Sequence, residues 1–567
     1  MTYSQIEKLK EINGSVDKLM VLIDEGIVTV DLFSDMLGDW ENVTGISSTY
    51  SKLLIEDRLD DFVKKVISDY QYFFAVMDYR RAYFIHKNNH WMAQILGIDE
   101  YEILNDLFEK YIDNDPETIK LFDGITNYKN LLDKARTTKE SVSDSNIYME
   151  LGDIFIDFNV DKAYLCYENA LFYCDNEEEK QTLNDKLTML KGKTNVKNTL
   201  VVIVSFNQSY FMQQNIIRIR ETLPKGSYKI VVVDNASTDG IAEWLKEQDD
   251  ILLALNKENI GFGAGCNQAV ELAKNNGYGD YDVFLLNNDT RLADNSLFWL
   301  RMGLYESEDV GGVGSISNYA GNKQQVEINC YSPREYLEYG HKNNIFMDEP
   351  YEERVRLNGF AVLIRNKVWE MIEGFDEQFF PGYFEDDDLS IRIRKLGKRL
   401  LVCKNSFIYH AGSQSFNKES NLKVIMEKNY RKLINKYGFN IVDYSYPTYN
   451  LIDYIERERK DIFNILILGA GMSADIIFLK NYYKNACVFG VEYNDLLRNC
   501  VKDSCVFDSF DSLYEDYSKK EGDKPLIFDY VIGYALNDDK YDIIISKLGE
   551  SIKYLEVDGE NVKLREK

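Results

Sequence analysis

The run TLVVIVSF at residues 199–206 is continuous, apolar and rich in β-branched residues. Such a run is typical of a strand that is buried on both faces, as the strands of parallel sheets are. Three further runs follow at intervals that leave room for helices: YKIVVVD at 228–234, ILLAL at 251–255 and YDVFLL at 281–286. Strands that alternate with helices predict a mostly parallel α/β sheet in this part of the chain.

The pattern of the sequence changes on both sides of this region. Residues 1–195 carry apolar positions at helical spacing and a single proline, Pro116, so we predict an all-helical domain there. Residues 196–440 form the predicted central α/β domain. Residues 441–460 are polar and end in the charged run IERERK, which indicates a linker, and a second α/β pattern runs from there to residue 567. The chain is therefore predicted to be multidomain, with boundaries at 1–195, 196–440 and 441–567.

The composition excludes several classes of partner. The 567 residues include 66 Lys and Arg against 94 Asp and Glu, which gives a net charge of −28. So acidic a chain repels phosphate polymers and anionic lipids, so we expect no nucleic-acid partner. No window approaches the roughly 18 apolar residues of a membrane span, and we expect no membrane insertion. The eight cysteines are scattered without a C-x-x-C pair, which favours reduced thiols and a cytoplasmic location.

Polar side chains and glycines follow each of the four predicted central strands. Because ligands bind at the carboxyl ends of parallel strands, this edge is the predicted ligand site. The residues are Ser205 and Asn207 after the first strand, Asp234 and Asn235 after the second, the segment NIGFGAGCN at 259–267 after the third, and Asn287, Asn288 and Asp289 after the fourth. A polar edge with close backbone approach suits a nucleotide.

Three later motifs complete a recognisable order: GFDEQFF at 374–380, YFEDDDLSIR at 383–392, and His410. With the four strand-end motifs they resemble the family 2 glycosyltransferases, and within that family the rhamnosyltransferase-like enzymes. The resemblance covers residues 198–415. It implies a GT-A fold, which binds a nucleotide sugar, here a uridine or thymidine diphosphate sugar, together with Mn²⁺ or Mg²⁺.

The resemblance also implies roles for single residues. Asp289 stands where the family has the last acid of its Asp-x-Asp metal motif, and it is the only carboxylate of that motif here. His410 matches a family histidine that can complete the metal coordination; a purely structural histidine is the alternative. The remaining matched positions are implied to contact the donor, and they are Ser205, Asn207, Asp234, Asn235, Asn259, Gly261, Asn267 and Asn288.

An inverting transfer needs a general base within hydrogen-bond reach of the acceptor hydroxyl. The run Glu385-Asp386-Asp387-Asp388 offers four acids, whose mutual repulsion can raise the pKa of one of them. The family pattern is Glu-Asp-x-Asp with its first aspartate as base, which implies Asp386. We expect Asp388 to begin a helix over Leu389–Leu396, as its cap or as the ion-pair partner of Arg392.

The C-terminal pattern predicts a Rossmann-like unit. A strand at 465–468 leads into Gly469 and Gly471, and a second strand at 488–491 leads into Glu492. This order is typical of a nucleotide site that could take NAD or S-adenosylmethionine. Segments 528–532 and 555–560 add a partial resemblance to class I methyltransferases, while the nucleotide-binding lobe of sugar acyltransferases is a further alternative.

Residues 148–171 resemble one tetratricopeptide repeat, and an ordinary helical hairpin is the alternative. The groove of such a repeat suits a peptide. We therefore expect a protein acceptor that offers a Ser or Thr hydroxyl, such as a bacterial surface or flagellar protein. A polysaccharide or lipid-linked glycan acceptor is the second hypothesis. A non-catalytic scaffold with a degenerate transferase fold is the third, and the presence of Asp289 and Asp386 argues against it.

Overall fold

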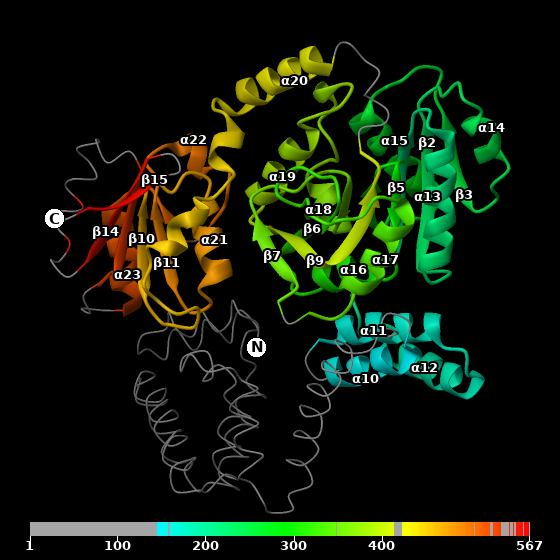
Figure 1. The fold of residues 1–567 in the computed structure, drawn as a ribbon, viewed down its shortest axis with the longest axis horizontal. Helices are drawn as coiled ribbons and strands as arrows, with labels where there is room; N and C mark the ends of the chain where they lie inside the picture. Colours follow the sequence, from blue (N-terminus) through cyan, green and yellow to red (C-terminus); the bar gives the residue numbers. More distant parts are fainter. Residues whose placement is uncertain are drawn as a thin grey trace, which may run out of the picture.

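The computed structural model describes residues 144–567, except for 157–158, 348, 413–421, 504, 522–525, 535–543, 545–547, 549–551, 559–560 and 566–567. Three parts are visible in Figure 1: a short helical segment, a central sheet covered by helices, and a second sheet. The predicted helical domain is therefore covered only from residue 144 to 195. The prediction for residues 1–143 lies outside the described residues.

The helical segment consists of α10 (Ser145–Phe155), α11 (Val160–Tyr173) and α12 (Glu177–Leu190). Each helix begins after an Asp or Asn whose side chain accepts a hydrogen bond from a first-turn amide. Helices α10 and α11 approach closely at Gly152, where an added Cβ would lie 2.4 Å from the Tyr167 ring. The structure thus confirms a helical hairpin at 148–171.

This hairpin is packed on the central domain through Asn295, at the start of α16 (Ser296–Leu304). The Asn295 amide donates to the Tyr148 hydroxyl at 2.6 Å, and its oxygen accepts from the Tyr173 hydroxyl at 3.0 Å and from Asn169 at 3.2 Å. Apolar side chains of α10 and α11 share one buried cluster with α16. Helix α16 thus packs against this hairpin, and the acceptor groove expected in residues 1–195 stays a prediction, because most of those residues lie outside the described part of the chain.

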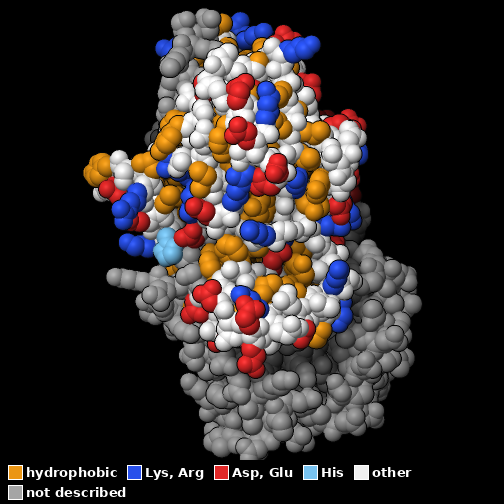
Figure 2. Space-filling view, turned by 90° about the vertical axis from the view of Figure 1, so that its right-hand side faces the viewer, with side chains coloured by type: hydrophobic (Ala, Val, Ile, Leu, Met, Phe, Trp, Pro, Cys, Tyr) orange, Lys and Arg blue, Asp and Glu red, His pale blue; other side chains and the backbone are white. Residues whose placement is uncertain are grey.

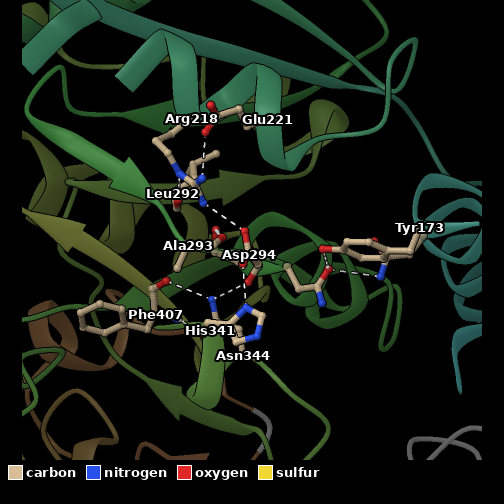
Figure 3. Close-up of polar contacts among 12 residues, drawn as sticks. Tyr173, Arg218, Glu221, Leu292, Ala293, Asp294, His341, Asn344 and Phe407 are labelled. Atoms are coloured by element: carbon tan, nitrogen blue, oxygen red, sulfur yellow. Dashed lines mark hydrogen bonds and ion pairs between the residues drawn. The ribbon is translucent and has the colours of Figure 1, made fainter. Parts of the chain in front are cut away.

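The loop that carries Asn295 is held from its other side by Asp294, which Figure 3 shows between Arg218 and His341. The Asp294 carboxylate accepts from Arg218 at 3.0 Å and lies 2.8 Å from Nδ1 of His341. Its carbonyl accepts from the Asn344 amide at 2.9 Å. The hairpin is thus anchored to a loop that is itself fixed by α13 (Ser209–Thr222), which carries Arg218, and by α17 (Pro333–Asn343), which carries His341.

Replacing Asn295 by Ala should destabilise the protein by about 1–3 kcal/mol, because buried hydroxyl and amide groups lose their partner. Thermal or urea unfolding of the full chain would measure this loss. Asn184→Ala is the matched control, since Asn184 is exposed and makes one local hydrogen bond within α12. Equal stability of the two variants would contradict the anchoring role of Asn295.

The central sheet has the order β3-β2-β1-β4-β8-β6-β9-β5, with β7 paired to β9. Its strands are β1 (Thr199–Ser205), β2 (Tyr228–Asp234), β3 (Ile251–Leu255), β4 (Asp282–Leu286), β5 (Thr290–Leu292), β6 (Val310–Ile316), β7 (Tyr351–Arg354), β8 (Ala361–Ile364) and β9 (Arg399–His410). The four predicted strands are confirmed, and they are parallel.

Beyond β4 the sheet is mixed, so the prediction of a mostly parallel sheet holds only for its first half. Strand β8 runs antiparallel to β4 and β6, and β5 and β7 run antiparallel to β9. A parallel neighbour needs a crossover of a dozen or more residues. Only residues 287–289 separate β4 from β5, so the regular strand–helix alternation ends there.

Helices cover both faces of this sheet (Figure 1). They are α13 (Ser209–Thr222), α14 (Ile241–Lys246), α15 (Phe262–Asn275), α16, α17 (Pro333–Asn343), α18 (Asn366–Met371) and α19 (Glu385–Lys395), while α20 (Leu422–Tyr437) lies apart from the sheet, toward the second domain. In β1, Val201 and Ile203 join one core while Leu200 and Val202 join the other. This alternation explains why the whole run is apolar.

The second sheet has the order β12-β11-β10-β13-β14-β15, parallel except for the last strand. Its strands are β10 (Asn464–Leu468), β11 (Cys487–Val491), β12 (Val506–Phe507), β13 (Tyr530–Tyr534), β14 (Lys553–Asp558) and β15 (Asn561–Arg565), and its helices are α21 (Ala474–Tyr482), α22 (Asp495–Arg498) and α23 (Phe510–Glu521). With β10 between β11 and β13, the arrangement is Rossmann-like.

Residues 441–460 are packed more firmly than a polar linker. Two short 3₁₀ helices, η2 (Ile441–Tyr444) and η3 (Tyr449–Asp453), lie in this segment. Ile441 is buried in a cluster that joins the central domain to α21, while Leu451 and Ile455 are buried in the core of the second sheet. Apolar residues spaced among the polar ones thus tie the two domains together.

The face of the central domain over α13 and α14 is shown in Figure 2. Acidic and basic side chains are interspersed there, with small apolar areas between them. None of the helices in the described part of the chain has both the length and the apolar character needed to cross a bilayer.

Candidate active site

The carboxyl ends of β1, β2 and β4 meet at one edge of the central sheet. Ser205 of β1 is in register with Asp234 of β2. On the other side of β1, Val202 is paired with Leu285 of β4. Ser205 and Asn288 each follow that pair by three residues, so they lie at about the same level. The Ser205 hydroxyl and the Asn288 amide nitrogen are buried and have no hydrogen-bond partner in the described structure. Because such groups are costly, they indicate positions that a polar ligand completes.

Asp234 and Asn207 join the loops that follow β2 and β1. The Asp234 carboxylate accepts from the amide of Ser237 at 3.0 Å and from its hydroxyl at 2.5 Å. The Asn207 side-chain oxygen accepts from the amide of Thr238 at 2.9 Å. The same Asn207 oxygen also accepts from the Thr238 hydroxyl at 3.4 Å, which uses its second lone pair, whereas the Asp234 carboxylate can still receive a hydrogen bond from a ligand.

The glycine-rich segment after β3 closes against the loop at 380–381. Asn235 donates to the Gly261 carbonyl at 3.1 Å, and Asn259 accepts from the Gly261 amide at 2.8 Å. Gly261 has φ +89°, and an added Cβ would lie 2.8 Å from the Phe380 ring. Only glycine tolerates both this φ and this close approach, so the segment forms a tight turn beside the ligand edge of the central sheet.

Asn267 is directed away from this turn. Its amide nitrogen donates to the Phe375 carbonyl and to Glu377, both at 2.9 Å, and its oxygen accepts from the Phe375 amide at 2.8 Å. These bonds hold the 374–377 segment against α15. The structure thus gives Asn267 a scaffolding position, unlike the other seven implied donor residues, which lie at the sheet edge or in its flanking turns.

Asp289 and His410 form the implied metal pair. Thr290 of β5 is in register with His410 of β9, which brings the preceding residue, Asp289, beside the ring. Asp289 Oδ1 lies 3.2 Å from His410 Nε2, and both side chains are buried. Nδ1 of the ring lies 2.8 Å from the Tyr319 carbonyl, which can only accept, so Nδ1 carries a proton. Nε2 itself lies 3.2 Å from the Asp289 carboxylate and 3.4 Å from the Asn287 amide nitrogen, which can donate to it. A carboxylate oxygen and an imidazole nitrogen therefore face the same space.

The chemistry of this pair fits a divalent cation that is shared with a substrate. Imidazole and carboxylate are both ligands of Mn²⁺, and carboxylate suits Mg²⁺. Among the described residues no group of three or more His, Cys, Asp or Glu side chains is placed to bind one ion, so this pair supplies two protein ligands at most from these residue types. Phe360 stacks on the His410 ring at 5.2 Å and 13°, which fixes its orientation.

The acidic run lies in the first turn of α19, which begins at Glu385 and not at Leu389 as expected. The unpaired amides and the dipole of a helix N-terminus favour acidic residues, so all four acids fit inside the helix. The expected partner of Asp388 is confirmed: it accepts from Arg392 at 2.8 Å and from the Tyr437 hydroxyl at 2.8 Å. Asp388 is thus a structural residue.

Asp386 is the acid whose pKa is placed for proton transfer. Its carboxylate accepts from the amides of Gly359 at 2.9 Å and Asp387 at 3.0 Å. Desolvation by the surrounding protein, and then the charge of Asp387, raise its pKa to about 7. Part of its surface remains accessible, as a base that meets an external hydroxyl requires. Desolvation and then Asp386 also raise the pKa of Glu385 well above its ordinary value.

Two neighbours of Asp386 were not predicted. Arg356 is buried and forms an ion pair with Asp387, so a positive charge balances the cluster. Gly359 leaves room for the Asp386 side chain, since an added Cβ would lie 3.0 Å from Cβ of Asp386. Both residues lie about 30 positions before α19, and nothing in their local sequence signals the contact.

The implied second nucleotide site makes bonds within its own domain. The amides of Gly469 and Ala470 donate to the Val491 carbonyl at 2.9 and 3.2 Å. The Gly471 amide donates to Glu492 at 2.8 Å, and the same carboxylate accepts from the Asn494 amide at 2.7 Å. These bonds order the glycine turn, and the Glu492 carboxylate keeps further lone pairs, as Asp234 does, so the cofactor expectation stays a prediction.

With this geometry in place, residues 197–434 match a family model, that of "Glycosyltransferase like family 2". Over these residues the chain is similar to family 2-like glycosyltransferases. No curated protein matches the chain.

Several solved structures are similar in part to this glycosyltransferase-like chain. The mannosyltransferase PcManGT from Pyrobaculum calidifontis, in complex with GDP-Man and Mn²⁺, is 17% identical over 42% of this chain and 65% of its own, with a TM-score of 0.31. GalNAc-T7 with UDP, GalNAc and Mn²⁺ is 14% identical over 52% and 55%, with a TM-score of 0.34. TarS 1–349 of S. aureus is 14% identical over 42% and 66%, with a TM-score of 0.29. The chain thus spans less than two thirds of each of these structures.

Proposed function

We propose that the central domain transfers a sugar from a nucleotide-sugar donor to a hydroxyl acceptor with inversion at the anomeric carbon. The observation that carries this proposal is that one domain, similar to family 2-like glycosyltransferases, contains two features that the reaction needs. One is Asp289 beside His410, which suits a divalent cation. The other is Asp386, a partly accessible carboxylate with a pKa of about 7.

The donor would lie along the sheet edge. A divalent cation held by Asp289 and His410 would neutralise the charge that develops on the departing diphosphate. Ser205 and Asn288 would complete their hydrogen bonds on the nucleotide, while Asp234 and Asn235 would meet the base or ribose. A uridine or thymidine diphosphate sugar is the proposed donor class, and Mn²⁺ or Mg²⁺ the proposed metal.

Asp386 would act on the acceptor side. Its carboxylate takes the proton of the acceptor hydroxyl while that oxygen bonds to the anomeric carbon, opposite the leaving diphosphate. The amide of Gly359 holds the carboxylate in place, and Arg356 with Asp387 sets the surrounding charge. A Ser or Thr hydroxyl of a protein is the proposed acceptor, and a hydroxyl of a polysaccharide or a lipid-linked glycan would also fit this step.

The rate should fall as pH is lowered through about 7, by about tenfold for each unit below it, because only ionised Asp386 accepts a proton. An ordinary aspartate would leave the rate flat down to about pH 5. A pH profile of kcat/KM for donor hydrolysis measures this fall in rate on the acidic side. A flat profile between pH 5 and 8 would remove Asp386 as the base.

A donor panel tests the proposed function directly. The full chain is incubated with UDP-, dTDP- and GDP-sugars in Mn²⁺, in Mg²⁺ or in excess EDTA, and released nucleoside diphosphate is detected by mass spectrometry. We expect release from at least one donor, only with a metal. No release from any donor would favour the non-catalytic scaffold hypothesis.

A further inference from the structure

The segment between the two domains reaches the candidate active site through Tyr446. The ring of Tyr446 lies 5.3 Å from the guanidinium carbon of Arg356, the residue that pairs with Asp387 beside the base. A cation held over an aromatic face is attracted to it, more strongly when it is shielded from water. Arg356 is 5% exposed, so the ring and the acidic cluster together enclose its charge.

Tyr446 also contacts the metal side of the site. Its hydroxyl donates to Asn322 at 3.0 Å. Asn322 lies in the loop at 317–325, which also contains Asn318 and Tyr319. Asn318 exchanges two hydrogen bonds with the backbone of His410, and the Tyr319 carbonyl accepts from its ring. One side chain therefore joins the loop behind the metal pair to the arginine behind the base.

The second domain holds this segment at the edge where a Rossmann-like sheet binds its ligand. Asp475, at the start of α21, accepts from the Thr448 amide at 2.7 Å. The Thr448 hydroxyl lies 2.7 Å from the hydroxyl of Tyr534, at the end of β13. An added Cβ on Gly471 would lie 3.1 Å from the Tyr444 ring, so Tyr444 covers the glycine turn.

A second contact fixes the same domain to the catalytic sheet. Asn481 of α21 accepts from the Glu353 amide at 3.2 Å and donates to the Glu353 carbonyl at 2.9 Å. Glu353 lies in β7, two residues before Val355, which joins the apolar cluster with Ile441 and Ile477. The second domain therefore contacts both the 441–449 segment and β7, the strand that leads to Arg356.

We propose that residues 441–449 are a wall of the catalytic site, held by the ligand edge of the C-terminal sheet, with Tyr446 as the positioning residue for Arg356 and for the 317–325 loop. The C-terminal domain then serves the transferase as a brace. For its kinetic consequence this inference rests on the proposed function; the structural consequence does not depend on it.

Hydrogen exchange of the full chain, followed by mass spectrometry, tests the structural consequence. Tyr446→Ala should speed exchange about tenfold or more in the peptides that cover 317–325 and 354–360. Tyr446→Phe should speed it in 317–325 only, since the ring over Arg356 remains while the bond to Asn322 is lost. Tyr454→Ala is the matched control, because Tyr454 is about equally exposed in the same segment and has no described contact with either peptide.

Donor hydrolysis separates positioning from a general loss of structure. With the donor that the wild type hydrolyses best, Tyr446→Ala should lower kcat about tenfold and leave the donor KM within about twofold. Thr448→Val removes the hydrogen bond to Tyr534 and should also speed hydrogen exchange in the peptides that cover 317–325 and 354–360. Unchanged exchange in Tyr446→Ala would overturn the inference. If the wild type hydrolyses no donor, the proposed function fails, and the exchange result alone decides the inference.

Discussion

Asp386→Asn should lower turnover by about 10²–10⁴-fold, the usual cost of losing a general base. The amide keeps the size of the side chain and can still accept from Gly359, but it cannot take the proton of an attacking hydroxyl. Donor binding should change little, because Asp289 and the sheet edge are untouched. Single-turnover kinetics with isothermal titration of the nucleotide would separate the two effects.

Two companions make this experiment decisive. Asp249→Asn is a matched control for the loss of one charge, since Asp249 is exposed in the loop before β3. Asp386→Glu keeps a carboxylate and should retain more activity than Asp386→Asn. Turnover of Asp386→Asn near the wild-type rate would mean that another group, or water alone, accepts the proton.

Asp289→Ala should weaken metal and donor binding together and lower the rate by about 10²–10⁴-fold. The substitution removes one of two protein ligands, and the stabilisation of a developing charge by a metal amounts to several kcal/mol. His410 Nε2 would then face the cation alone. Binding of Mn²⁺ in the presence and absence of UDP, measured by electron paramagnetic resonance, would report the loss without any need for turnover.

Asp280→Ala is the control for this variant, because Asp280 is exposed and precedes β4, whereas Asp289 follows its carboxyl end. We expect Asp280→Ala to bind Mn²⁺ as the wild type does. Wild-type metal affinity in Asp289→Ala, or full activity of the wild type in excess EDTA, would contradict the metal role of the Asp289–His410 pair.

The hydrogen bonds of Glu492 show that a Rossmann-like sequence pattern can also form a turn that is closed by its own side chains. The strand, glycine turn, helix, strand and acid of residues 465–492 satisfy a nucleotide-binding pattern, and the sheet order agrees with it. Yet Glu492 accepts from Gly471 and Asn494, while Tyr444 covers the turn. The same glycines that admit a phosphate also permit a tight turn over a carboxylate, so the motif alone does not separate these outcomes.

Local patterns in the sequence determined the strands, the polar edge and the acidic run of this protein. The run at 228–234 coincides with β2, whose last five residues are buried, as an unbroken apolar stretch requires. The run at 251–255 coincides with β3, although this strand lies at the edge of the sheet and only Ile251 is buried. Motif order placed Asp289 near His410, which the pairing of β5 with β9 confirms. These features depend on neighbouring residues or on a chain order that the family resemblance supplies.

Only the tertiary structure decided which polar groups remain free for a ligand. Asn267 and Asn288 look alike in the sequence. The Asn267 side-chain nitrogen donates to the Phe375 carbonyl, 108 residues away, while the Asn288 nitrogen has no partner in the described structure. Tyr446 reaches Asn322 across 124 residues. Hydrogen bonds saturate, and their partners are chosen by packing between distant segments, so spacing along the chain cannot reveal which donor or acceptor is left over.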